Sequence, residues 1–180
     1  MSKAKAIFLD LFGTLIEDHG FFEEVADVMF KSGALEFLKK VEDEGFLIFI
    51  SIFREEDDVP NMKYVESIQS KILNVLTTHG INKDSVSFLS HVHSEQPDLH
   101  PLTPVFIRTL EKDYKLDLTK SVIIGDLMQD VKIGKTVGAK TILLSSPVDS
   151  PWIQDVDWSE PDFMVENLTE AAEKIVNCDF

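Results

Sequence analysis

The sequence predicts an α/β fold, built as a three-layer, doubly wound parallel sheet. Two observations predict it. Short apolar runs of strand-forming residues alternate with segments of helical periodicity along all 180 residues, and glycines stand where helical segments end. Alternation of this kind is typical of a parallel sheet that carries helices on both faces. No internal repeat or linker divides the chain, so we expect a single domain over residues 1–180.

Each predicted element depends on local spacing. In the first helical segment Ala34, Leu38 and Val41 recur at helical spacing, and Gly45 ends the helix. Residues 46–53 form an uninterrupted apolar run, as expected of a strand buried on both faces. The other strands are predicted before Asp10 and at 86–89, 121–124, 140–144 and 163–165; the helices at 21–45 with a break near 31–33, 64–79, 105–114, 126–137 and 167–177; and loops at 54–61, 91–104 and 145–161.

Composition restricts the class of protein and its partners. Hydrophobic residues make up 44% and charged residues 27% of the chain, which is ordinary for a soluble globular protein. The formal net charge of -15 argues against nucleic acid or an anionic membrane as a partner, because both are themselves negative. Cys178 is the single cysteine, so no intrachain disulfide can form and a reducing compartment is expected. With no signal peptide and no apolar stretch near the length of a membrane span, we expect a cytoplasmic protein.

Asp10 follows the first apolar run, and Gly13 and Thr14 then break that run. A strand therefore delivers a carboxylate to the carboxyl edge of the predicted sheet, where α/β proteins bind ligands. From these residues alone, an aspartate that caps the next turn is an equal alternative.

A second apolar strand ends in Gly125 and Asp126, and Asp130 follows four residues later. The i, i+4 spacing predicts that Asp126 and Asp130 share one face of the first turn of a helix. Together with Asp10 they would form a cluster of three carboxylates, which requires a cation. Oxygen ligands without nearby histidine or cysteine favour a hard ion, and we expect Mg²⁺.

These residues together resemble motifs of the haloacid dehalogenase superfamily of phosphohydrolases, over residues 6 to about 144. The resemblance implies a Rossmann-like core. Flanking residues are similar to the branch of the histidinol-phosphate and heptose-bisphosphate phosphatases. The motifs are Asp10-x-x-Gly13-Thr14-Leu15, Ser51 after its strand, and Gly125-Asp126-x-x-x-Asp130; the flanking segments are Gly33-Ala34-Leu35-x-x-Leu38-Lys39 and Gly134-Lys135-x-x-Gly138-Ala139-Lys140-Thr141.

The resemblance implies a role for each matched residue. Asp10 would be the nucleophile that forms an aspartyl-phosphate, Ser51 would donate its hydroxyl to the transferring phosphoryl group, and Thr14 would orient the motif. The implied Mg²⁺ ligands are Asp10, the backbone carbonyl of Phe12, Asp126 and Asp130.

Two positions depart from the pattern of the superfamily. Phe12 stands where its phosphatases carry an aspartate that protonates the leaving group, and such acid help is typically worth about 10² to 10⁴ in rate. His100 stands where a lysine would hold the phosphate, and its charge would depend on pH near neutrality. A metal site built from His91, His93 and His100 is not expected, because the loop contains no cysteine.

About forty residues separate Asp10 from Ser51, so no cap domain fits and the site should be open. The leading hypothesis is a Mg²⁺-dependent phosphohydrolase acting on a small phosphorylated metabolite such as a sugar phosphate. A catalytically impaired relative that binds metal, phosphate or a partner is the alternative that Phe12 and His100 favour. A haloacid dehalogenase is a third reading, which the retained Gly125-Asp126-x-x-x-Asp130 motif disfavours. The sequence does not indicate an oligomeric state.

Overall fold

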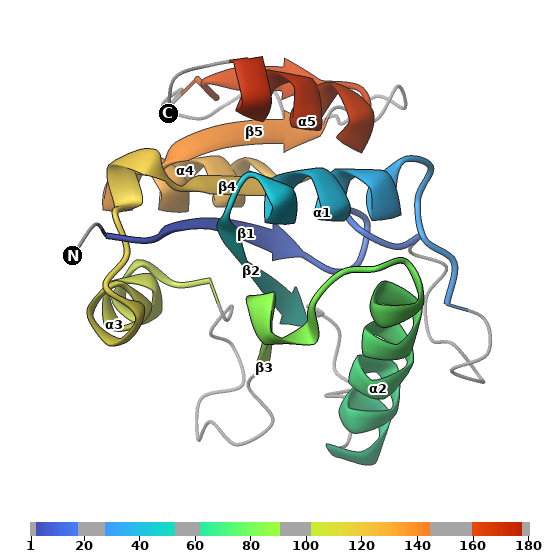
Figure 1. Cartoon of the computed structure of the whole chain (residues 1–180). Coiled ribbons are helices and arrows are strands. Elements are labelled where there is room, and N and C mark those ends of the chain that lie inside the picture. The colour runs from blue at the N-terminus through green and yellow to red at the C-terminus, as the bar shows by residue number, and fades with distance from the viewer. Residues whose placement is uncertain (1–2, 18–27, 53–61, 91–101, 145–159, 178–180) are drawn as a thin grey trace.

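Six parallel strands form the centre of the computed structural model, which describes residues 3–17, 28–52, 62–90, 102–144 and 160–177. Helices cover both faces of the sheet, as the alternation of elements predicts (Figure 1). The strands are β1 (Lys5–Asp10), β2 (Phe46–Ile52), β3 (Val86–Ser90), β4 (Val122–Gly125), β5 (Lys140–Leu144) and β6 (Phe163–Val165); the helices are α1 (Ala34–Asp43), α2 (Met62–Thr78), α3 (Pro104–Tyr114), α4 (Met128–Val137) and α5 (Leu168–Asn177).

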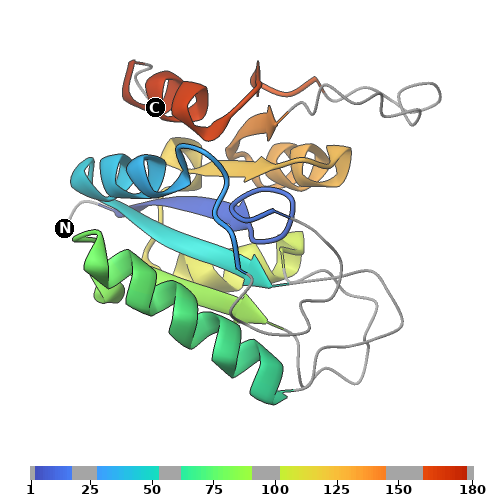
Figure 2. The same ribbon diagram turned by 90° about the vertical axis from the view of Figure 1, so that its right-hand side faces the viewer.

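The strand order is β3-β2-β1-β4-β5-β6, and every neighbouring pair is parallel. The chain builds the sheet outward from β1 in one direction and then returns to the centre to build outward from β4 in the other. The arrowheads of the strands point the same way in Figure 2. In open α/β sheets, ligands bind outside the carboxyl ends of the strands where the order reverses, which here is between β1 and β4. The predicted α/β fold class is confirmed.

Side chains that alternate along the strands fill two separate cores. In β1, Ile7 and Leu9 belong to the core that α1, α2 and α5 cover, whereas Ala6 and Phe8 belong to the core that α3 and α4 cover. All four are fully buried. A strand buried on both faces needs apolar residues at every position, which explains the uninterrupted apolar runs in the sequence.

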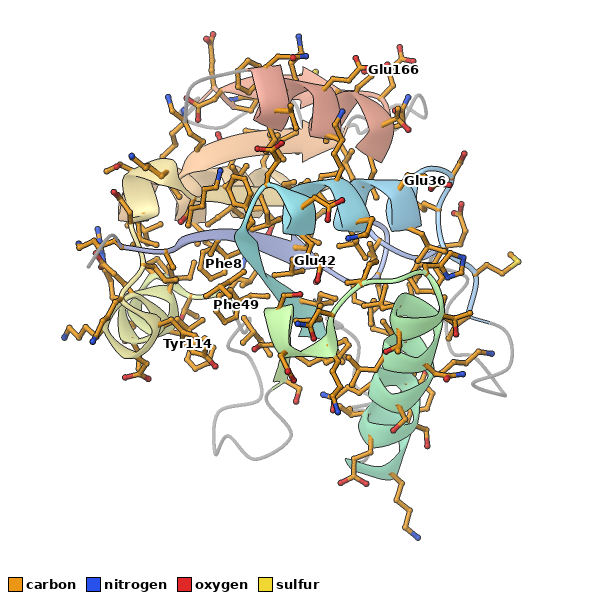
Figure 3. The ribbon with its side chains drawn as sticks, viewed as in Figure 1. Phe8, Glu36, Glu42, Phe49, Tyr114 and Glu166 are labelled. Atoms are coloured by element: carbon orange, nitrogen blue, oxygen red, sulfur yellow. The ribbon has the colours of Figure 1, made fainter. Side chains whose placement is uncertain are left out.

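Three aromatic rings link β1, β2 and α3: Phe8 and Phe49 lie in the second core, and Tyr114 is exposed beside Phe49 (Figure 3). The rings of Phe8 and Phe49 stack with their centroids 5.1 Å apart, and the ring of Tyr114 meets Phe49 edge-on at the same separation. Both arrangements are favoured by the quadrupoles of aromatic rings. These ring contacts pack α3 against the two strands that carry Asp10 and Ser51.

The hydrogen-bonded carboxylate of Asp162 links α4, β5 and the start of β6. Oδ2 of Asp162 accepts hydrogen bonds from the N–H of Thr141 at 2.9 Å, from its hydroxyl at 2.9 Å, and from Nζ of Lys135 at 2.8 Å. Partial burial would raise the pKa of Asp162, but the hydrogen bonds from Lys135 and Thr141 outweigh it and hold the pKa below its ordinary value. The edge strand is thereby tied to its neighbour by an ionised side chain.

The helix predicted at 21–45 is wrong over residues 28–30, which are not helical, whereas the break predicted near 31–33 is confirmed; residues 18–27 lie outside the described part of the chain. Phe30 instead forms an antiparallel bridge with Ile16, and the N–H of Glu17 donates to the carbonyl of Met29. The helix begins only after Gly33, whose φ of 78° is left-handed. A Cβ at Gly33 would overlap the hydroxyl of Thr169, so glycine is required there.

The N-terminus of α4 also differs from its prediction. Asp126 precedes the helix, because Leu127 is the N-cap in extended conformation and the helix begins at Met128. Asp126 and Asp130 therefore do not share a helical turn. Among the described helices, none combines the length and the apolar character that crossing a bilayer requires.

Candidate active site

Asp10 and Ser51 occupy equivalent positions at the carboxyl ends of two paired strands. They are register partners in the β1–β2 ladder, and the N–H of Leu11 donates to the carbonyl of Ser51 at 2.9 Å. Ser51 is fully buried, and Asp10 is half-buried with its Oδ1 atom out of contact with solvent. The central strands thus bring the predicted nucleophile and the predicted hydroxyl donor to the same edge of the sheet.

A tight turn follows Asp10. The N–H groups of Leu15 and Ile16 both donate to the carbonyl of Leu11 at 3.0 Å, and the N–H of Gly13 donates to the carbonyl of Ile16 at 3.0 Å. Gly13 has a φ of +74°, which an L-residue adopts only with strain. Thr14 is fully buried within this turn.

This turn lies directly against the side chain of Asp126. A Cβ built on Gly13 would overlap the Oδ2 atom of Asp126, so the absence of a side chain at position 13 makes room for that carboxylate. This contact is not among the sequence-based predictions, although a glycine three residues after Asp10 was the available signal. The contact places the loop after β1 beside the residue that follows β4, across the point where the strand order reverses.

Asp130 reaches back from α4 toward the end of β4. Its Oδ2 accepts a hydrogen bond from the N–H of Leu127 at 3.3 Å, and a Cβ at Gly125 would overlap the same carboxylate. The side chain is only 3% exposed. Asp130 therefore caps the first turn of α4 as well as lying beside the candidate site.

The negative charges of Asp10, Asp126 and Asp130 act on one another. Burial raises the pKa of Asp10 well above its usual value, and the charges of Asp130 and Asp126 raise it further, against a smaller lowering effect of the Leu11 N–H. Burial likewise raises the pKa of Asp130 to about 7, with Asp126 adding to the rise and the Leu127 N–H opposing it. Three negative charges that disfavour one another in this way would be stabilised together by a cation.

Four buried oxygen atoms at this edge have no hydrogen-bond partner among the described residues. They are Oδ1 of Asp10, Oγ1 of Thr14, Oγ of Ser51 and Oδ1 of Asp130. Buried polar atoms are normally paired with protein, water or ions. Their concentration at the carboxyl ends of β1, β2 and β4 is what a site that binds a polar ligand requires.

The donor set fits Mg²⁺ in kind. Within the described ranges, no three side chains of His, Cys, Asp or Glu lie close enough together to hold a metal ion by themselves. Mg²⁺ does not need that many, because it usually keeps several waters and binds through one or two carboxylates plus substrate phosphates. The carboxylate oxygens of Asp10 and Asp130 that lack partners are ligands of the type that this ion prefers.

Phe12 lies between Asp10 and Thr14 in the sequence, but its side chain belongs to the apolar core. Its side chain is 5% exposed and packs with the cluster that α1, α2 and α5 cover. Other predicted positions cannot be compared with the structure: His91, His93 and His100 lie outside the described residues. The roles of Asp10, Phe12, Thr14, Ser51, Asp126 and Asp130 stay predictions.

Comparisons with known proteins agree with this arrangement. A family model described as HAD-hydrolase-like matches residues 102–171. D-glycero-beta-D-manno-heptose-1,7-bisphosphate 7-phosphatase of Helicobacter pylori is 26% identical over 170 residues, covering 89% of this chain and 96% of the relative. The Haemophilus ducreyi protein of the same name is 25% identical over 152 residues, covering 78% and 82%.

A solved structure of D,D-heptose 1,7-bisphosphate phosphatase from B. bronchiseptica, complexed with magnesium and phosphate, has a similar fold. The TM-score is 0.77 at 17% identity, and the match covers 96% of this chain and 98% of the other. Fold and site define a Rossmann-like hydrolase with carboxylates at the centre of the sheet. The chain is similar to hydrolases of the haloacid dehalogenase superfamily. Within that superfamily it is similar to the capless heptose-bisphosphate phosphatase branch.

Proposed function

We propose that this chain is a Mg²⁺-dependent phosphohydrolase that transfers a phosphoryl group to Asp10 before water releases it. The observation that carries the proposal is the position of Asp10 at the carboxyl end of β1, beside the carboxylates of Asp126 and Asp130. Aspartate carboxylates can form covalent aspartyl-phosphates. The names of the curated relatives support a small phosphorylated metabolite, and specifically a sugar phosphate, as the substrate.

The proposed Mg²⁺ ligands are Asp10, the backbone carbonyl of Phe12, Asp126 and Asp130. When bound, the ion would neutralise charge on the phosphate and on the carboxylates. Burial and the neighbouring carboxylates disfavour the charged form of Asp10 and so raise its pKa, and a cation would favour that charged, nucleophilic form.

The remaining residues position the phosphoryl group. An oxygen of Asp10 attacks phosphorus, and the hydroxyl of Ser51, held in register with Asp10 by the β1–β2 ladder, donates to a phosphoryl oxygen. The proposed role of Thr14, which is fully buried, is to orient the turn that carries Gly13. His100 would hold the phosphate from a segment outside the described residues.

A second candidate function is a binder of metal or phosphate with impaired catalysis. The buried ring of Phe12 favours it, because a phenyl group cannot take part in proton transfer. Both functions use the same residues, and only the phosphohydrolase requires turnover. One experiment therefore separates them.

That experiment is the hydrolysis of 4-nitrophenyl phosphate by wild type, Asp10→Asn and Asp113→Asn, with Mg²⁺ and with EDTA. Asp113 is an exposed carboxylate on α3 and serves as the matched control. We expect Mg²⁺-dependent turnover in wild type and Asp113→Asn, its loss in Asp10→Asn, and an acid-stable phosphorylated species only where Asp10 is intact. Turnover by Asp10→Asn would refute the nucleophile, and an inert wild type that still binds Mg²⁺ would favour the binder.

A further inference from the structure

The side chain at the second position after Asp10 is the ring of Phe12, which cannot donate a proton. It is 5% exposed and forms part of the core beneath α1, α2 and α5. A phenyl group carries no proton to donate. The resemblance places a leaving-group acid at this position, and in this chain the position is filled by packed hydrocarbon.

The carboxyl groups described near Asp10 are poorly suited to replace that acid. Among the described residues, the charged side chains that act on Asp10 are those of Asp130 and Asp126. Asp130 is 3% exposed and its Oδ2 is held by the N–H of Leu127, so it cannot approach a leaving group. Asp126 lies against the turn at Gly13 and is proposed to bind the cation.

The bond changes show where the missing proton matters. An oxygen of Asp10 forms a bond to phosphorus, and the bond from phosphorus to the leaving oxygen breaks, so that this oxygen departs with the electron pair as an anion and takes a proton from water afterwards. Water then attacks the aspartyl-phosphate, which releases inorganic phosphate and restores the carboxylate of Asp10. The first step is fast without an acid only when the leaving oxygen is a weak base. In the second step the leaving group is the carboxylate of Asp10, which is already a weak base.

We propose that Phe12 is a specificity-determining residue that restricts this site to phosphoryl groups carried on weakly basic oxygens. Acyl phosphates meet the requirement best, since their leaving group is the same kind of carboxylate that departs from the enzyme's own intermediate. Among sugar phosphates, the rule favours a phosphate on the anomeric oxygen over one on a primary hydroxyl, because the anomeric oxygen is the weaker base. The inference rests on the proposed phosphohydrolase function.

The test compares kcat/KM for acetyl phosphate, 4-nitrophenyl phosphate, glucose 1-phosphate and glucose 6-phosphate, with Mg²⁺ present. In wild type we expect kcat/KM to fall in that order. Phe12→Asp should raise kcat/KM for glucose 6-phosphate relative to acetyl phosphate by about 10²-fold or more, since an acid helps the strongest base most. Phe12→Leu keeps an apolar side chain in the core and should change all four values by a common factor.

Wild type that hydrolyses glucose 6-phosphate as fast as acetyl phosphate would overturn the inference. So would a Phe12→Leu variant that shifts the ranking as Phe12→Asp does. A carboxylate at a core position can unfold the protein, and in that case the ranking of the four substrates by wild type decides alone. Asp10→Asn, measured beside them, tests the phosphohydrolase function separately: activity that survives it refutes that function, whereas a flat ranking with an essential Asp10 refutes only the restriction.

Discussion

Replacing Gly13 with alanine tests whether the turn after β1 holds Asp126 in its position for binding a cation. Gly13 has a φ of +74°, and a left-handed backbone costs an L-residue about 1–2 kcal/mol. The smaller entropy of alanine in the unfolded chain offsets roughly 0.4–1 kcal/mol of this cost. The net loss is about 1 kcal/mol, or about 2–4 °C in Tm for a chain of this size. In addition, the new methyl group would overlap Oδ2 of Asp126 and force the carboxylate to move.

Gly45→Ala is the matched control. Gly45 has a φ of +81°, and a Cβ there would meet nothing within 4 Å, so this variant has the backbone strain without the displaced carboxylate. Both variants should lose stability through strain. Only Gly13→Ala should also lose affinity for Mg²⁺.

Thermal unfolding in a Mg²⁺ titration measures both effects. At a concentration of about 100 Kd, binding stabilises the folded state by about 2.7 kcal/mol, and a tenfold weaker site reduces this to about 1.4 kcal/mol. In Tm these values correspond to rises of about 5–10 °C for wild type and Gly45→Ala and about 3–6 °C for Gly13→Ala. Equal rises in the two variants would refute the link between Gly13 and Asp126, and no rise in wild type would refute the Mg²⁺ site itself.

Two further predictions concern carboxylates whose pKa values are shifted. Because the folded pKa of Asp162 lies below its ordinary value, its contribution to stability is present above that ordinary value and is lost as the pH falls through the lowered one. Asp162→Asn should therefore cost about 1–3 kcal/mol in urea unfolding at pH 7 and less at pH 3, with Asp113→Asn as the control; an equal cost at both pH values would contradict this. Burial raises the folded pKa of Asp130 to about 7, so without divalent cations the folded state binds more protons than the unfolded state from about pH 4 to pH 7, and the free energy of unfolding falls as the pH rises through this window. Asp130→Asn, which keeps an acceptor for the Leu127 N–H, should show a smaller fall between pH 4.5 and pH 7.5 in EDTA, and an unchanged fall would be evidence against the shift.

The strands could be predicted from the sequence because their signal is local. Residues 46–53 are apolar except for Ser51, and β2 occupies 46–52 of them, between two helix-covered faces. The end of α1 was equally local, because Gly45 takes the left-handed conformation that terminates a helix. The start of α1 does not depend on local sequence alone. Residues 28–31 pair with the turn that follows β1, and this tertiary contact overrides the helical periodicity of the segment.

The candidate site was predictable in its residue types and less so in its geometry. Carboxylates at the ends of apolar strands pointed to the carboxyl edge of the sheet, and β1 and β4 are adjacent there as expected. The contact of Gly13 with Asp126 depends on how two distant turns meet, which spacing does not encode. The capping role of Asp130 depends on α4 beginning at Met128 rather than at Asp126, a difference of two residues that changes which face Asp126 occupies.

The reversal of strand order between β1 and β4 also determines when the site can exist during folding. Asp10 and Asp126 are more than a hundred positions apart in the sequence, yet they meet across one pair of neighbouring strands. Contacts of such high sequence separation form late in folding. The closure of the long intervening loop costs entropy, and only the strand pairing that follows offsets this cost. A growing chain therefore carries Asp10 long before β4 can supply Asp126, and the proposed cation site can form only when the centre of the sheet closes.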